Sequence, residues 1–172
     1  MVFEMQTSNS GTLLQQISAF RVGEQTFGIP ALLIEEFFRP LPVTRVPGSD
    51  SRVDGVVNIR GTNAVVVNLR SCLDLPRTPE QESEMILLET EQGLVDEARH
   101  LDFHAFNEPV VLRIDETLKI YNVPWGALHP PPAHINCPFV EGVIETDDVY
   151  ITLLSCTQLI QNILRTSEEA LS

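Results

Sequence analysis

Residues 53–75 read VDGVVNIRGTNAVVVNLRSCLDL and contain two similar apolar segments that each end in arginine. The segment VVNIR (56–60) is followed by Gly61-Thr62-Asn63, and VVNLR (66–70) repeats its pattern ten residues later. Apolar, β-branched runs on either side of a tight Gly/Asn loop predict a β-hairpin. The second run, residues 64–69, is too continuously apolar to leave one face in water, so we expect a strand buried on both sides.

Further short strands are predicted on both sides of this hairpin, at residues 16–22, 26–30, 43–46, 85–91, 109–115, 117–123 and 148–154. Residues 30–38 place apolar side chains at roughly helical spacing behind a proline, which predicts one short helix. Ser155 can cap a closing helix whose apolar stripe is Leu159, Ile160, Ile163 and Leu164. Many short strands with few helices predict an all-β fold built from small barrels rather than a parallel sheet.

The length of 172 residues and the 43% hydrophobic content suit one domain with a proper core. We expect a flexible N-terminal tail at residues 1–13, a single domain of two β-rich lobes at 14–166, and a C-terminal tail at 167–172. The acidic, polar stretch 77–84 separates the two lobes in the sequence.

The formal net charge of −13 excludes most nucleic-acid binders, because affinity for a phosphate backbone needs clustered Lys and Arg. Binding to membrane surfaces is disfavoured for the same reason. The sequence contains no run of 18 apolar residues, so we expect no membrane-spanning helix. The three cysteines fit no disulfide framework, and residues 1–16 lack the pattern of an export signal. These features predict a cytoplasmic protein.

Catalysis and metal binding have weak support in the sequence. There is no GxSxG motif, no phosphate-binding glycine motif and no cysteine in a local pattern with a paired histidine. His100 and His104 lie four residues apart, and His134 and Cys137 form an HxxC pair, but zinc needs three or four convergent ligands. We therefore expect neither an enzyme nor a cofactor, with a small metal-binding hydrolase using these four residues as the less favoured alternative.

Residues 27–75 resemble the CheW-like domain of bacterial chemosensory adaptors. Three motifs carry the resemblance: IEEF (34–37), VTRV (43–46) and, the most specific, GVVNIRG (55–61). The spacing between them matches the family pattern without insertions or deletions. Residues 110–120 and 138–160 match more weakly, so the resemblance covers about residues 16–165. Asn68 stands where the family usually has Asp, and residues 92–108 look like an insertion. Such departures suit a divergent member, for instance from a type IV pilus (twitching) chemosensory system.

The resemblance implies two small five-stranded β-barrels packed side by side with a C-terminal helix. It also implies a non-catalytic adaptor that bridges the cytoplasmic tip of methyl-accepting chemoreceptors and the regulatory domain of a sensor histidine kinase. An adaptor for a different signalling complex is the alternative. The residues implied at partner contacts are Ile34, Glu36, Val43, Arg45, Val57, Asn58, Arg60 and Gly61. Arginine is enriched at such contacts, so Arg60 is the central expectation.

Overall fold

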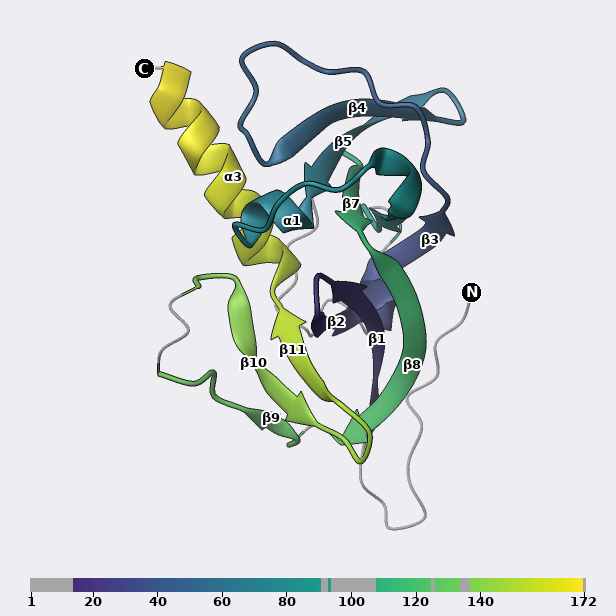
Figure 1. Ribbon diagram of the computed structural model, residues 1–172, viewed down its shortest axis with the longest axis vertical. Coiled ribbons are helices and arrows are strands. Elements are labelled where there is room, and N and C mark those ends of the chain that lie inside the picture. The colour runs from purple at the N-terminus through teal and green to yellow at the C-terminus, as the bar shows by residue number, and fades with distance from the viewer. Residues whose placement is uncertain (1–13, 91–92, 94–107, 125, 134–136, 172) are drawn as a thin grey trace.

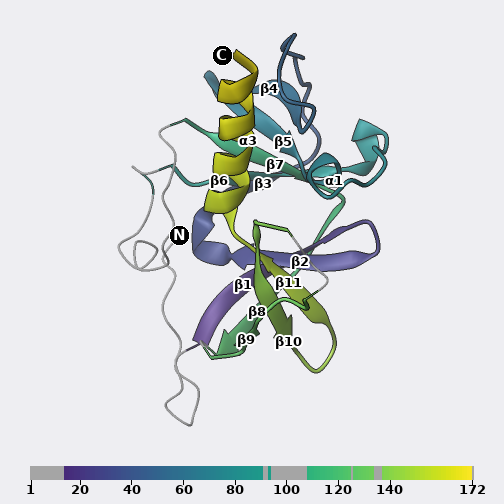
Figure 2. The ribbon, with the colours of Figure 1, turned by 90° about the vertical axis from the view of Figure 1, so that its left-hand side faces the viewer.

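The computed structural model describes residues 14–90, 93, 108–124, 126–133 and 137–171, and it contains two β-sheets and a C-terminal helix (Figure 1). One sheet lies above the other, and the helix runs beside the upper sheet, as the view turned by 90° also shows (Figure 2). Buried apolar residues from both sheets and the helix form one shared cluster, which includes Phe20, Leu69, Leu112 and Leu159. The two lobes are therefore joined by a common core.

The lower sheet has six strands in the order β8-β1-β2-β11-β10-β9. Its strands are antiparallel except for the pair β2 and β11. The hairpin expected from residues 16–30 is confirmed, because β1 and β2 pair in register up to Val22 and Gln25. The strands are β1 (Leu14–Val22), β2 (Gln25–Pro30), β8 (Glu116–Pro124), β9 (Leu128–His129), β10 (Val140–Glu145) and β11 (Tyr150–Leu154).

The upper sheet has five strands in the order β3-β6-β7-β5-β4. The predicted hairpin at residues 55–69 is confirmed, with Asn58 opposite Asn63, but its loop is Arg60-Gly61 rather than residues 61–63, because Thr62 and Asn63 already pair in β5. β5 lies between β4 and β7, and its two faces pack against different apolar clusters, Val66 in one and Val67 in the other. Residues 64–68 are therefore buried except for the partly exposed Val65. The strands are β3 (Ile34–Phe38), β4 (Val53–Ile59), β5 (Thr62–Asn68), β6 (Glu84–Leu88) and β7 (Val110–Ile114).

Helices are few and mostly short: η1 (Ala31–Leu33), α1 (Leu69–Cys72), η2 (Glu80–Glu82) and α3 (Cys156–Leu171). The backbone N–H of Gln158 donates to the Ser155 hydroxyl at 3.2 Å, so the expected N-cap of α3 is confirmed. Leu159, Ile160 and Ile163 form its buried stripe. The helix continues through most of residues 167–172, and the tail expected at residues 1–13 lies outside the described residues.

The predicted helix at residues 30–38 is wrong. Only η1 is helical there, and residues 34–38 form β3, because β6 offers a hydrogen-bonding partner strand to a segment whose local pattern favoured a helix. A bulge between Ile34 and Glu36 disturbs the strict alternation of a strand, which explains the misleading spacing. The strand predicted at 43–46 is reduced to one bridge between Thr44 and Val56.

The mostly-β fold in two strand-rich lobes is confirmed, but the strand counts and connections differ in detail from two five-stranded barrels. The expected division of the lobes at residues 77–84 is wrong, because β6 and β7 join the sheet of β3, β4 and β5, whereas β1 and β2 join the sheet of β8 to β11. One lobe has six strands and the other five. Among the described residues, the hydrogen bonding of neither sheet runs from the last strand back to the first. Each sheet nevertheless curls around its own apolar cluster, one including Ile17, Ile144 and Ile151 and the other Val57, Val66 and Met85.

A buried ionic cluster lies where β4, β5 and β7 come together in the upper sheet. The Asp54 carboxylate accepts hydrogen bonds from Arg113 Nε at 2.6 Å and from Asn68 Nδ2 at 3.1 Å, and it also pairs with Arg77. The side chains of Asp54 and Arg113 are only 3% and 5% exposed. Arg113 also donates to the Ser83 hydroxyl at 2.8 Å. Charges this deeply buried are tolerated when they are paired and hydrogen-bonded.

Candidate functional site

The hairpin of β4 and β5 ends in a two-residue turn, Arg60-Gly61. Both residues have positive φ, 50° and 85°, as the tight turns that suit twisted hairpins require. Nothing lies within 4 Å of a Cβ added at Gly61, so its requirement for glycine is conformational. The Asn58 side chain supports the turn, because its Oδ1 accepts from the Gly61 N–H at 3.1 Å and its Nδ2 donates to Asn63 Oδ1 at 3.2 Å.

Arg60 extends from this turn across to β3. Its Nη2 donates to Glu36 Oε2 at 2.8 Å and lies 4.0 Å from Glu35 Oε1. Its guanidinium carbon is 5.9 Å from the centre of the Phe38 ring, within the range of a cation–π contact. The hydrogen bond with Glu36 raises the pKa of Arg60 above its ordinary value. The side chain remains 62% exposed, so it is held in place while still facing solvent.

This ion pair joins the two edges of the upper sheet. β3 and β4 are its edge strands, and Arg60 directly follows β4 whereas Glu36 belongs to β3. The sheet therefore curls until side chains from its two edges meet, and Phe38 and Val43 pack against the apolar cluster inside the curl. Side chains rather than backbone hydrogen bonds complete this barrel-like shape.

The eight residues expected at partner contacts divide into three groups. Asn58, Arg60 and Gly61 are exposed around the turn, and the partly exposed Glu36 reaches it through Arg60, so the structure brings these four together. Arg45 is exposed on the neighbouring segment. The other three are less accessible: Ile34 and Val57 are buried in the core, and Val43 is half-buried against it.

Gly55, the first glycine of the GVVNIRG motif, lets the chain segment that carries Arg45 approach β4. A Cβ at this position would lie 2.1 Å from the Thr44 carbonyl oxygen, and its φ of 142° is one that other residues rarely adopt. The close approach allows Thr44 and Val56 to exchange two backbone hydrogen bonds of 2.9 and 2.8 Å. The motif thus contains one glycine for packing and one, Gly61, for the turn.

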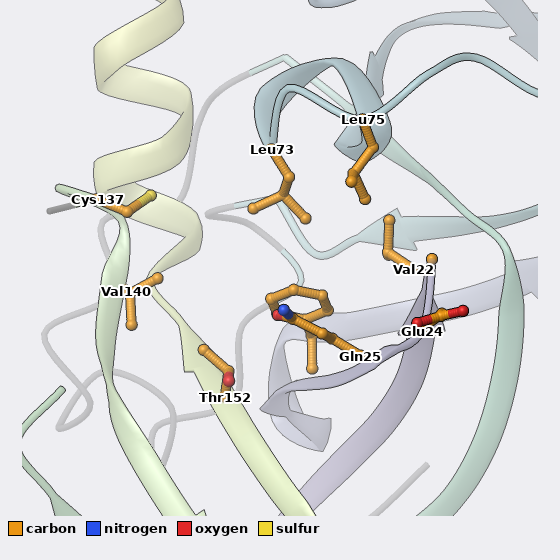
Figure 3. A pocket seen from close by; sticks show the side chains of 10 residues that line it. Val22, Glu24, Gln25, Leu73, Leu75, Cys137, Val140 and Thr152 are labelled. Carbon is orange, nitrogen blue, oxygen red and sulfur yellow. The ribbon is translucent and has the colours of Figure 1, made fainter. Parts of the chain in front are cut away.

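A second candidate surface is a groove of about 450 Å³ between the lower sheet and the segment that follows α1 (Figure 3). Leu73 and Leu75, which follow α1, form one wall, and the turn between β1 and β2 faces them. Of the residues that line the groove, only Cys137 was a candidate site residue from the sequence, because the groove is assembled from segments that lie far apart in the chain. The lining residues are Val22, Gly23, Glu24, Gln25, Phe27, Leu73, Leu75, Cys137, Val140 and Thr152.

Metal binding gains no support from the part of the chain that the structure describes. There, no three His, Cys, Asp or Glu side chains are grouped so as to hold a metal ion. Cys137 is partly buried in the groove, and burial raises the pKa of its thiol. His100, His104 and His134 lie outside the described residues. Within the described residues, none of the helices is long and apolar enough to cross a lipid bilayer.

Comparison with known proteins identifies the family. The CheW-like domain matches residues 16–164. The chain belongs to the CheW-like domain family. Over 163 residues it is 23% identical to a probable chemotaxis protein CheW of Rhizobium etli, covering 92% of this chain and 94% of that protein. A stretch of 55 residues, 32% of this chain and 33% of the relative, is 38% identical to the chemotaxis protein CheW of Helicobacter pylori.

The fold of this CheW-like chain is also similar to a solved structure. The crystal structure of the scaffolding protein TtCheW from Thermoanaerobacter tengcongensis matches with a TM-score of 0.70 at 21% identity, covering 85% of this chain and 92% of that one. CheW proteins are non-catalytic scaffolds or adaptors, which agrees with the expectation that the protein is not an enzyme.

Proposed function

We propose that this CheW-like protein couples methyl-accepting chemoreceptors to a sensor histidine kinase in the cytoplasm. The observation that carries the proposal is the presence of two different surfaces on one shared core, the Arg60 turn and the groove between the lower sheet and the segment after α1. The two surfaces have no residue in common, so one molecule can hold two partners at once. Simultaneous binding is sufficient for an adaptor, because a signal can pass as a change in the relative geometry of the two bound partners.

The groove is suited to the receptor tip. Its walls are largely apolar, with Phe27, Leu75 and Val140 among them, and Glu24 and Gln25 supply polar groups. A helix that lays its apolar face into a hydrophobic groove is a recurrent mode of recognition. The cytoplasmic tip of a methyl-accepting receptor is helical, so we assign the groove to it.

The Arg60 turn is suited to the kinase regulatory domain. Arg60 is exposed, yet its contacts with Glu36 and Phe38 hold it in place, so little side-chain freedom would be lost when a partner binds. An arginine held in this way offers planar hydrogen bonding to a carboxylate and an apolar face for packing. These properties are those of residues that dominate binding energy at protein interfaces.

The experiment is a pair of binding titrations with the purified kinase regulatory domain and with a receptor-tip fragment. We expect Arg60→Glu to weaken kinase binding about tenfold or more while receptor binding stays the same. Asp148→Asn, which removes an exposed ion pair with Lys119 in the lower sheet, is the control and leaves both affinities unchanged. Unchanged kinase binding by Arg60→Glu would contradict the assignment of the turn.

The groove is tested by Leu75→Glu, which introduces a charge into one apolar wall. We expect this variant to lose receptor binding while it keeps kinase binding, because an unpaired charge is costly where an apolar helix face must dock. If neither the kinase nor the receptor fragment binds the unaltered protein, then it serves a different signalling complex. The identity of the kinase that binds also tells whether the output is chemotaxis or twitching motility.

A further inference from the structure

An ion pair between Arg70 and Asp115 lies beside the groove and connects its two walls. Arg70, in α1, donates from Nε to Asp115 Oδ1 at 2.7 Å and from Nη2 to Asp115 Oδ2 at 2.6 Å. This is the bidentate geometry in which arginine holds a carboxylate most firmly. The two side chains are 19% and 17% exposed, so the pair is largely shielded from solvent. Neither side chain lines the groove itself.

Asp115 holds the wall formed by the turn between β1 and β2. Its Oδ2 accepts a hydrogen bond of 2.8 Å from the Gly23 N–H, and its own N–H donates to the Arg21 carbonyl at 3.0 Å. Gly23 has a φ of 65°, and a Cβ at this position would lie 3.1 Å from Leu75 Cδ1. The two walls therefore come into close contact at this end of the groove.

Arg70 holds the opposite wall. Its carbonyl accepts from the Leu75 N–H at 2.8 Å and from the Leu73 N–H at 3.2 Å. Its Nη1 donates to the Pro76 carbonyl at 2.9 Å. One side chain thus connects the segment that carries both wall leucines to the carboxylate that holds Gly23.

We propose that Arg70 and Asp115 are a positioning pair that fixes the spacing between the two walls of the groove and so sets its affinity for a docked helix. The pair acts through Gly23 and Leu75, which line the groove, and its role in binding rests on the function proposed above. Burial raises the pKa of Asp115, but the hydrogen bonds from Arg70 and Gly23 outweigh this and lower it. The carboxylate is therefore ionised at neutral pH, as the pair requires.

The test combines Asp115→Asn and Arg70→Gln with two readouts. The first is the affinity for a synthetic helical hairpin with the sequence of a receptor tip from the same organism. The second needs no receptor: it is the rate at which a maleimide labels Cys137, which lines the groove, measured by peptide mass mapping. Burial raises the pKa of Cys72 and Cys156 to about 12, so these two thiols label slowly and provide internal references. Circular dichroism verifies that each variant is folded.

We expect both variants to weaken hairpin binding about tenfold and to speed the labelling of Cys137 severalfold, because the walls are no longer held together. Asp148→Asn removes an ion pair of the same lower sheet away from the groove and changes neither readout. If Leu75→Glu abolishes binding while Asp115→Asn and Arg70→Gln match the unaltered protein in both readouts, the groove keeps its assignment and the positioning role is overturned. If Leu75→Glu leaves hairpin binding intact, the assignment of the groove to the receptor fails. Unchanged labelling of Cys137 in Asp115→Asn and Arg70→Gln would then overturn the spacing role as well.

Discussion

Arg60 and Arg70 follow two strands of nearly identical sequence, and their surroundings differ. Arg60 sits on an exposed turn, 62% accessible to solvent, where Glu36 and Phe38 hold it on the surface. Arg70 is 19% exposed and joins the two lobes through Asp115. The asparagines two residues before them differ in the same way. Asn58 supports an exposed turn, whereas Asn68 is buried, binds Asp54 and caps α1 through the Ser71 N–H.

The difference follows from the antiparallel pairing of β4 and β5. Two strands that run in opposite directions place their carboxyl ends at opposite ends of the sheet. The end of β4 reaches solvent at the turn, and the end of β5 runs into α1 between the lobes. Two segments of nearly identical sequence therefore end in arginines with different roles. Arg60 is a candidate interaction residue, and Arg70 organises the fold.

The largest expected effect is at the buried ionic cluster, in which Asn68 takes part. Asp54→Ala removes the carboxylate that compensates Arg113, whose side chain is only 5% exposed. We expect the free energy of unfolding to fall by about 3–5 kcal/mol, because an unpaired buried charge is left behind. Urea denaturation followed by circular dichroism measures the loss, with Asp148→Ala at an exposed pair as the control. A loss below about 1 kcal/mol would show that the cluster adds little to stability.

An intermediate effect is expected at Arg70. Arg70→Ala removes two hydrogen bonds to Asp115 and one to the Pro76 carbonyl. We expect the free energy of unfolding to fall by roughly 1.5–3 kcal/mol, the range for hydrogen bonds to a charged group. Urea denaturation measures this loss. Arg60→Ala, measured in the same way, should have the same denaturation midpoint as the unaltered protein. Equal midpoints for the two variants would remove the contrast between the two arginines.

Acid titration sharpens the contrast further, because the partner of Arg70 has a lowered pKa. A carboxyl whose folded pKa lies below its unfolded value of 3.8 stabilises the protein above that value. This contribution is lost as the pH falls through the folded pKa. We expect the stability difference between the unaltered protein and Asp115→Asn to shrink between about pH 5 and about pH 2. Denaturation at each pH measures it, and a constant difference would contradict the prediction.

Features that depend on neighbouring residues could be predicted from the sequence. The hairpin around Arg60 follows from two apolar runs and a tight loop, and the start of α3 follows from Ser155 and the apolar stripe behind it. The strand β3 could not be predicted in this way. Its bulge mimics helical spacing, and its partner β6 lies about fifty residues away in the chain.

The two candidate surfaces differ in the same respect. The GVVNIRG motif points to Arg60, but no sequence pattern predicts its ion pair with Glu36 across the edges of the sheet. The residues that line the groove could not be predicted from the sequence, because its walls come from β1 and β2, from the segment after α1, and from β10 and β11. No local pattern connects these segments. Asp54 and Arg113 are likewise 59 residues apart and meet only in the folded sheet.

The smallest expected change in stability comes from Arg60→Gly, and it tests the contrast most directly. Arg60 has a φ of 50°, a conformation that costs little for glycine and more for other residues. Replacement by glycine relieves this strain and removes only exposed contacts, so we expect the melting temperature to stay unchanged or to rise slightly. Gly61→Ala, which places a side chain at a φ of 85°, is the matched variant and should lower it.

The turn requires a positive φ at position 60 but does not require an arginine there, so the strain of placing one at this position points to a role of the side chain outside the fold. Arg60→Gly should therefore fold as well as the unaltered protein while it binds the kinase regulatory domain about tenfold more weakly. Differential scanning calorimetry and the binding titration measure the two quantities on one preparation. A fall in melting temperature as large as that of Arg70→Ala would mean that Arg60 supports the fold, and the two arginines would then have the same role.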